Sequence, residues 1–217
     1  MSKRTLPPTA SVAEAGEGAR LVAPSASRNV DAIGALLEHV APRTGKALEI
    51  ASGTGQHVAA FAPRLPGLLW QPTDVEDERL ASIDAYAKGI ETILPARRLD
   101  ATRPGWAAEY SDLSLVTLAN LLHLISGPEA TVLIEEAAKT LGPGGRLVLY
   151  GPFMRNGALT SEGDIRFHQS LSTQDPEIGY KNDQEIIATI EGTGLSMVEV
   201  VDMPANNLAL IAERHAT

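Results

Sequence analysis

The stretch Ala47–Phe61, ALEIASGTGQHVAAF, holds an apolar run that breaks into Gly53-Thr54-Gly55 and then takes on a helical pattern. Ala47–Ala51 predicts a buried strand, and Val58 and Phe61 predict the buried face of a short helix. Glycines at such a junction let the backbone approach a ligand closely. The stretch therefore predicts a strand, a ligand-binding turn and a helix in succession.

Strand and helix patterns go on alternating along the chain. Helical spacing predicts further helices around 30–41, 80–87, 128–141 and 183–191. Apolar runs predict further strands at 68–71, 96–99, 114–119, 146–150, 197–201 and 208–212. Alternation indicates parallel strands joined by right-handed crossovers, and the closing pair of strands indicates an antiparallel hairpin. The predicted fold is an α/β, Rossmann-like three-layer sandwich with a seven-stranded, mostly parallel sheet and an antiparallel C-terminal hairpin strand.

The chain of 217 residues is long enough for one sizeable core. Residues 1–24 are rich in Pro, Ala, Gly, Ser and Glu and predict a flexible arm that folds partly over the domain, while 25–217 form a single domain. Within it, the polar, glycine-dotted segment 152–181 predicts an elaborated loop with a short helix, and we expect it to form an acceptor lid.

Composition excludes several classes of function. The net charge of −9 disfavours nucleic acid and anionic membranes as partners. With no cysteine there is no disulfide, thiolate metal site or cysteine nucleophile. The five histidines show no paired metal-ligand spacing, so we expect no metal. No signal peptide or membrane span is evident, and the expected location is the cytoplasm.

The glycine turn does not match the two common nucleotide-binding patterns. A phosphate-binding loop needs a Gly-Lys-Ser/Thr ending that is absent here. A dinucleotide fingerprint needs a third glycine where this chain has Val58, which counts mildly against NAD.

Acidic residues stand where ligands of a parallel sheet bind, beyond the carboxyl ends of the strands. Glu49 lies inside an apolar strand, and either organises the turn for a cationic ligand or touches solvent at the strand end. Asp74 lies 74 − 53 = 21 positions after Gly53, which suits an acceptor for ribose hydroxyls, although it could instead cap the next helix. Asp100 ends the third strand as an adenine-amino acceptor or a plain turn residue, and Asn120 follows the fourth strand.

Together, Glu49–Gly55, Asp74, Asp100, Asn120 and the turn Leu141-Gly142-Pro143-Gly144-Gly145 resemble the class I S-adenosylmethionine-dependent methyltransferases. The resemblance implies S-adenosylmethionine as cofactor, with its methionine end on the turn, its ribose on the second acid and its adenine near the third. The implied cofactor-binding residues are Arg28, Asn29, Glu49, Ala51, Ser52, Gly53, Thr54, Gly55, Asp74, Val75, Asp100, Ala101, Asn120 and Leu121.

More specifically, the chain resembles a little-characterised methyltransferase-like family once described as a domain of unknown function, over roughly residues 24 to 213. The strings that carry this resemblance are Ser27-Arg28-Asn29 before the first helix, Trp70–Asp74, Tyr150–Phe153, Asp175-Pro176 and Met203–Asn207. In this chain Ala51-Ser52 replaces the more usual charged or glycine-rich start of the turn. The resemblance to this family does not identify a substrate.

Several polar residues are candidates for acceptor binding or catalysis. His123 is the candidate general base, with a structural role at a helix entry as the alternative. Tyr150, Asn206 and Asn207 could bind substrate, or serve packing and turn formation. Arg28 could grip a carboxylate, while Asn29 could cap the first helix.

The leading hypothesis is a methyltransferase that acts on a small-molecule acceptor. Two alternatives stay open, a non-catalytic protein that binds S-adenosylmethionine and a nicotinamide-dependent oxidoreductase. Oligomeric state does not follow from the sequence.

Overall fold

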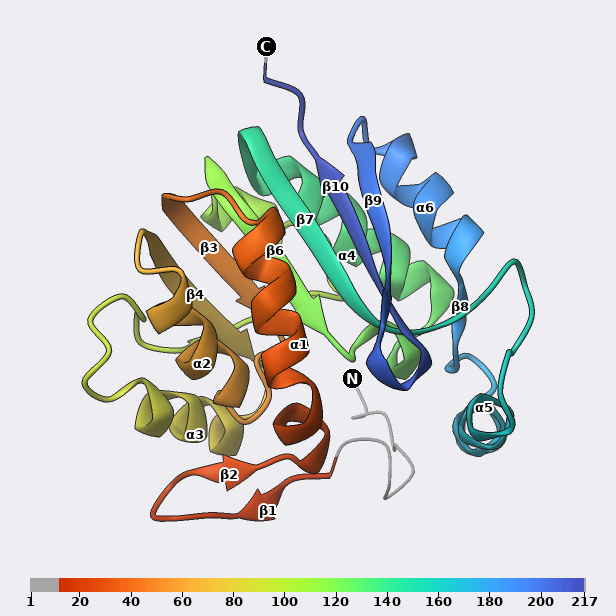
Figure 1. Cartoon of the computed structure of the whole chain (residues 1–217), viewed down its shortest axis with the longest axis horizontal. Coiled ribbons are helices and arrows are strands. Elements are labelled where there is room, and N and C mark those ends of the chain that lie inside the picture. The colour runs from red at the N-terminus through yellow and green to blue at the C-terminus, as the bar shows by residue number, and fades with distance from the viewer. Residues whose placement is uncertain (1–11, 217) are drawn as a thin grey trace.

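The computed structural model describes residues 12–216. Its centre is a sheet in the order β5-β4-β3-β6-β7-β10-β9, with the short β8 beside β7 (Figure 1). The strands are β3 (Gly45–Ile50), β4 (Leu68–Asp74), β5 (Arg97–Arg98), β6 (Leu113–Ala119), β7 (Leu141–Met154), β8 (Lys181–Asn182), β9 (Ser196–Met203) and β10 (Asn207–Glu213). β10 is antiparallel to both β7 and β9, and the β3, β4, β5, β6, β7 and β8 pairings are parallel. The predicted fold class is confirmed.

Helices cover both faces of this sheet (Figure 1). They are α1 (Pro24–Val40), α2 (Gln56–Arg64), α3 (Asp77–Ala87), α4 (Gly127–Thr140), α5 (Glu162–Gln174) and α6 (Asp183–Gly192), with short 3-10 turns η1 (Trp106–Glu109), η2 (Leu122–Leu124) and η3 (Pro204–Asn206). α1, α2 and α3 pack through one buried apolar cluster, and α4 and α6 pack through a second.

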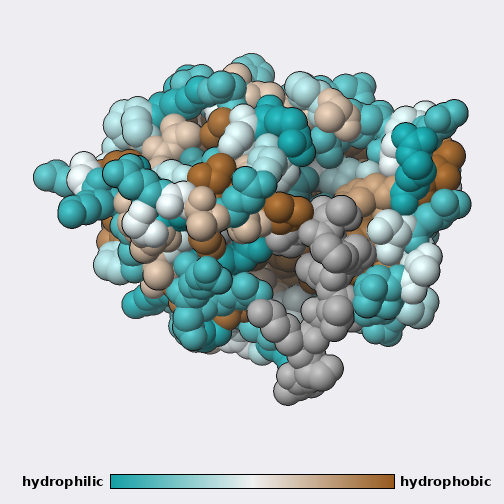
Figure 2. Space-filling model, turned by 90° about the horizontal axis from the view of Figure 1, so that it is seen from below, coloured by the Kyte–Doolittle hydropathy of each residue, from teal (hydrophilic) through white to brown (hydrophobic). Residues whose placement is uncertain are grey.

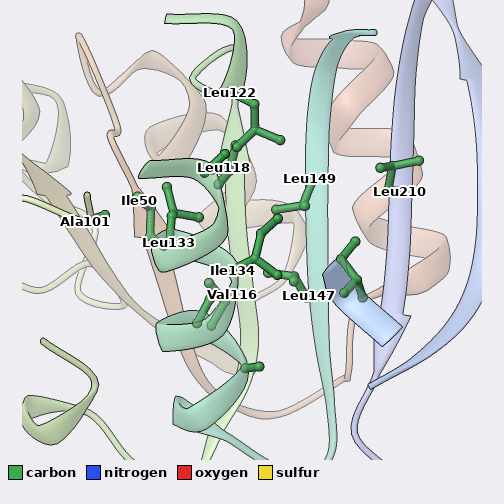
Figure 3. Packing of buried hydrophobic residues seen from close by; sticks show 14 of the residues in the cluster. Ile50, Ala101, Val116, Leu118, Leu122, Leu133, Ile134, Leu147, Leu149 and Leu210 are labelled. Atoms are coloured by element: carbon green, nitrogen blue, oxygen red, sulfur yellow. The ribbon is translucent and has the colours of Figure 1, made fainter. Parts of the chain in front are cut away.

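The second cluster shows why the aliphatic runs form this sheet. Leu133 and Ile134 of α4 lie against apolar side chains of β6 and β7, all fully buried (Figure 3). Alternate residues of each central strand face opposite helix layers, so both faces must be apolar. α4 begins with a capping box between Ser126 and Glu129, as the sequence predicts.

Three local features differ from the sequence-based expectations. Ser27-Arg28-Asn29 lies inside α1 and not before it, because Pro24 starts the helix. β7 is much longer than 146–150, since residues 142–145 bulge opposite Ser114 while the strand pairing continues. Segment 152–181 contains a helix of 13 residues, longer than the short helix expected. Its length is not evident from the sequence, because only Asp164 and Leu171 of that helix are buried.

The segment before α1 also has structure in its described part. β1 (Glu14–Ala15) and β2 (Leu21–Val22) form an antiparallel hairpin. Arg20 donates to the backbone oxygen of Ala85 and stacks on the Tyr86 ring, 4.9 Å from its centroid. The expected arm thus includes a hairpin seated on α3, and residues 1–11 lie outside the described residues.

No helix within residues 12–216 is long and apolar enough to cross a bilayer. Within the same range, no group of three or more His, Cys, Asp or Glu side chains could hold a metal ion.

Candidate functional site

The predicted site residues gather at the edge of the sheet where the parallel strands end, the lower edge in Figure 1. β3 lies between β4 and β6, so the turn after β3 lies between Asp74 and Asn120. Figure 2 views the molecule from this side, and its surface is hollowed toward the middle. Ligands of open α/β sheets bind at such an edge.

The turn after β3 has a left-handed backbone at three of its five residues. Ala51, Gly53 and Gly55 have φ values of 51°, 60° and 87°. A Cβ on Gly55 would lie 2.7 Å from the backbone of Ile83 in α3, so this position admits only glycine. Ala51 takes the same region with a side chain, which costs energy. Such strain is typical of backbone held for a ligand.

Asp74 fastens this turn to the end of β4. One carboxylate oxygen accepts the backbone N–H of Gly53 at 2.9 Å, and the other accepts those of Val75 at 2.7 Å and Glu76 at 3.2 Å. Burial raises the pKa of Asp74, and these N–H groups and the charge of Arg79 oppose the rise. A carboxylate has about four lone-pair positions, so acceptor capacity is left for a hydroxyl donor.

Glu49 is a second buried acid on the neighbouring strand. The residue is 4% exposed, and its Oε2 has no hydrogen-bond partner among the described residues. Burial raises its pKa to about 8, Asp74 adds to the rise, and the Ser52 hydroxyl opposes it. The carboxyl is therefore mostly protonated at neutral pH and would ionise if a cation came within reach.

The third predicted acid, Asp100, follows a residue that is hydrogen-bonded to the backbone of Asp74. The backbone N–H of Leu99 donates to the Asp74 backbone oxygen at 3.1 Å. The Asp100 side chain is exposed and accepts from Thr102 and Arg103, while Ala101 is buried. These contacts are those of a turn residue, the second of the two roles that the sequence suggests for Asp100.

A group of polar side chains brings α1, α2, β7 and β10 together. Asn29 Oδ1 and His57 Nε2 are 2.8 Å apart. Burial raises the pKa of the Tyr150 hydroxyl, and the nearby side chains of Asn29 and Asn207 oppose the rise. Burial lowers the pKa of His57 to about 4, so its ring is neutral at pH 7. Three predicted residues meet here, and the sequence reasoning missed His57. Its place two residues after Gly55 was the available signal.

His123 and Asn206 belong to a different cluster, built around α5. His123 is 4% exposed, its ring meets the edges of the Phe167 and Tyr180 rings, and its Nδ1 has no partner among the described residues. Burial, helped by the Lys181 charge, lowers its pKa to about 3. A base works best with a pKa near the working pH, so this environment makes His123 a poor one.

Asp164 is the polar centre of the α5 cluster. It accepts hydrogen bonds from the Tyr180 hydroxyl at 3.0 Å, from the Ser161 hydroxyl at 2.6 Å and from the Asn206 amide. Asn206 also donates to the Thr160 hydroxyl at 2.6 Å. The adjacent residues Asn206 and Asn207 therefore serve different clusters, and Asn206 ties α5 to the β9–β10 turn.

Arg28 stays apart from both networks. It lies on the exposed side of α1, next to the buried Asn29. Its predicted contact with a ligand carboxylate stays a prediction.

This sheet order, with one reversed strand near the end, defines a Rossmann-like α/β fold that solved methyltransferases share. An O-methyltransferase family protein from Burkholderia thailandensis matches with a TM-score of 0.74 and 21% identity, over 88% of this chain and 57% of that one. Human N-acetylserotonin methyltransferase in complex with SAM matches with a TM-score of 0.73 and 15% identity, over 88% and 53%. A putative O-methyltransferase from Nostoc punctiforme matches with a TM-score of 0.76 and 17% identity, over 88% and 57%.

At these identities the likeness shows the fold, and this chain spans little more than half the length of the proteins it matches. Residues 20–214 match the family described as "Protein of unknown function (DUF938)". The chain belongs to that family.

Proposed function

We propose that this protein is an S-adenosylmethionine-dependent methyltransferase that acts on a small-molecule acceptor. One observation carries the proposal. Two buried acids lie at the ends of neighbouring strands, Glu49 next to the last residue of β3 and Asp74 at the last residue of β4. The left-handed glycine turn follows β3, and solved methyltransferases share this fold. Hydroxyl donors suit the spare capacity of Asp74, and an ammonium group suits the unpartnered oxygen of Glu49.

In this proposal the ribose lies at Asp74 and the adenine against the neighbouring Val75, an apolar residue that is 46% exposed. Asp100 and Ala101 border the adenine in this proposal. They directly follow Leu99, whose backbone N–H donates to the backbone oxygen of Asp74. The remaining predicted contacts are the turn Ala51–Gly55 with Glu49 for the methionine end, Arg28 and Asn29 for its carboxylate, and Asn120 and Leu121 for the floor of the site.

When bound, S-adenosylmethionine supplies a methyl group that an acceptor takes from sulfur by in-line displacement. The protein's task is to hold two reactants in line, which can contribute several kcal/mol to the rate without an acid or base. Tyr150 and Asn207 lie beside Asn29 at the edge where the strands end, and Asn206 joins the β9–β10 turn to α5. Tyr150, Asn206 and Asn207 are the proposed acceptor-side residues.

His123 remains the candidate base, but its lowered pKa favours a positioning role. This observation also supports a second candidate function, a protein that binds S-adenosylmethionine without transferring its methyl group.

Calorimetry of the full chain with S-adenosylmethionine, S-adenosylhomocysteine and NAD is the first test. The proposal expects micromolar or tighter binding of the two S-adenosyl compounds and weak or no binding of NAD. Tighter binding of NAD contradicts it. Consumption of S-adenosylmethionine in the presence of a panel of small hydroxyl, thiol and amine compounds then separates the enzyme from the non-catalytic binder.

A further inference from the structure

The segment before α1 is hydrogen-bonded to the glycine turn from two sides, and both connections end on one residue, Thr54. Thr54 is 3% exposed and lies between the left-handed glycines Gly53 and Gly55. The segment and the turn therefore share their hydrogen-bond partners.

The first connection passes through Ser82 of α3. Its hydroxyl donates to the backbone oxygen of Thr54 at 2.7 Å and accepts the backbone N–H of Leu21 at 2.8 Å. Ser82 and Thr54 are both buried, so the Thr54 oxygen is left without a partner when the hydroxyl is lost.

The second connection passes through Gln56, the first residue of α2. Its Oε1 accepts the backbone N–H of Ala23 at 2.7 Å and the hydroxyl of Thr54 at 2.9 Å. Its Nε2 donates to the Ser27 hydroxyl at 3.0 Å, in the first turns of α1. One amide thus joins the turn, the segment and a helix.

The β1–β2 hairpin adds a third anchor on α3, through Arg20 with Ala85 and Tyr86. Figure 1 shows the hairpin below α3 and α2, at the same edge of the molecule as the glycine turn. α3 itself presses on the turn, since Ile83 leaves no room for a side chain at Gly55.

We infer that Ser82 and Gln56 are positioning residues that make residues 20–27 part of the cofactor site, so that cofactor binding and the ordering of this segment reinforce each other. The inference rests on the proposed function. It follows from linkage, because a segment that holds the turn in its binding geometry is itself held more firmly when the turn is occupied.

The test is hydrogen exchange of the full chain with and without S-adenosylmethionine, read at the amides of Leu21 and Ala23. These two N–H groups donate to Ser82 and Gln56, so they report the connections directly. We expect saturating S-adenosylmethionine to slow their exchange at least about fivefold, which corresponds to a coupling of roughly 1 kcal/mol.

The matching variant is Ser82→Ala, with Thr140→Val as control. Thr140 is also fully buried, but its hydroxyl donates to the Ala137 oxygen of its own helix, α4, on the opposite face of the sheet. Ser82→Ala is expected to weaken S-adenosylmethionine binding about tenfold, while Thr140→Val lowers stability and leaves affinity unchanged.

Unchanged exchange at Leu21 and Ala23 in protein that binds S-adenosylmethionine overturns the inference, and so does equal affinity in Ser82→Ala. The exchange arm uses the wild-type chain and decides the question even if Ser82→Ala fails to fold. Absence of S-adenosylmethionine binding by the wild-type chain instead overturns the proposed function.

Discussion

The carboxylate of Asp74, at the end of β4, accepts a hydrogen bond of 2.9 Å from the backbone N–H of Gly53 in the turn after β3. The two residues stand 21 positions apart, and the bond brings the ends of adjacent strands into one unit. Because Asp74 also accepts the N–H groups of Val75 and Glu76, it shapes the site before any ligand arrives.

Removal of this carboxylate is the first test of the cofactor site. Asp74→Ala is expected to weaken S-adenosylmethionine binding by about 1–3 kcal/mol, because a charged acceptor is lost and the Gly53 N–H is left unpaired. Calorimetry measures the change. Asp31→Ala is the matched control, since Asp31 is exposed on α1 and pairs with Arg64, and surface pairs contribute little. Equal affinity in the two variants would remove Asp74 from the site.

The pKa of Glu49 predicts how stability of the ligand-free protein depends on pH. The pKa is about 8 in the folded chain, against 4.5 for an unperturbed glutamate. The folded state therefore holds a proton that the unfolded state releases, so the contribution to stability is full below pH 4.5 and is lost as the pH rises toward 8. Denaturant titrations should show a loss of roughly 1 kcal/mol per pH unit within this window. Glu49→Gln should flatten the curve there and be the more stable protein at pH 8. If stability fell with pH equally in the wild-type protein and in Glu49→Gln, the raised pKa of Glu49 would be contradicted.

The same group predicts proton release on cofactor binding. If an ammonium group of the ligand pairs with Glu49, the carboxyl ionises and releases up to one proton near pH 7. Calorimetry in two buffers with different ionisation enthalpies measures this number. Glu49→Gln should release no proton and bind more weakly. Binding without proton release in the wild-type chain would mean that the ligand cation does not reach Glu49.

The sequence predicts the carboxyl edge well because its signals are local. Apolar runs mark the strands, and each run ends at the residue that supplies a site group, as at Asp74 and Asn120. Parallel connections then bring these ends together. The glycine turn that follows the first of these strands is part of the same local pattern, whereas the order of the strands in the sheet comes from the structure.

The side-chain networks could not be predicted, because they join residues that are distant in sequence and individually ordinary. Asn29 and His57 are 28 positions apart, and Asp164 and Asn206 are 42 apart. The sequence predicts α5 only as a short helix, because most of its residues are exposed and few of them are apolar. The hairpin before α1 is too short to leave a strand pattern.

Ala51 offers a test of strain in the glycine turn. Its φ of 51° lies in the left-handed region, which costs a residue with a Cβ roughly 1–2 kcal/mol and glycine little. Ala51→Gly is expected to stabilise the protein by up to about 1 kcal/mol, after the entropy of the unfolded chain is subtracted, and to raise Tm by about 2–4 °C. Ala188→Gly, at an exposed interior position of α6, should instead destabilise by about 1 kcal/mol. A loss of stability in both variants would show that the backbone of Ala51 is not strained.

The contact of Asn206 with Asp164 predicts that one amide holds α5 closed. Asn206→Ala removes the donor to Asp164 and Thr160, and hydrogen bonds to charged groups contribute about 1.5–3 kcal/mol. We expect amide exchange across Glu162–Gln174 to accelerate by tenfold or more, since local opening becomes easier by that energy. S-adenosylmethionine affinity should stay unchanged, because the cluster around Asp164 is separate from Glu49 and Asp74. Gln184→Ala, an exposed substitution in α6, serves as the control and should leave α5 exchange as it is. Unaltered exchange of α5 in Asn206→Ala would show that other contacts, such as Tyr180 with Asp164, hold the segment.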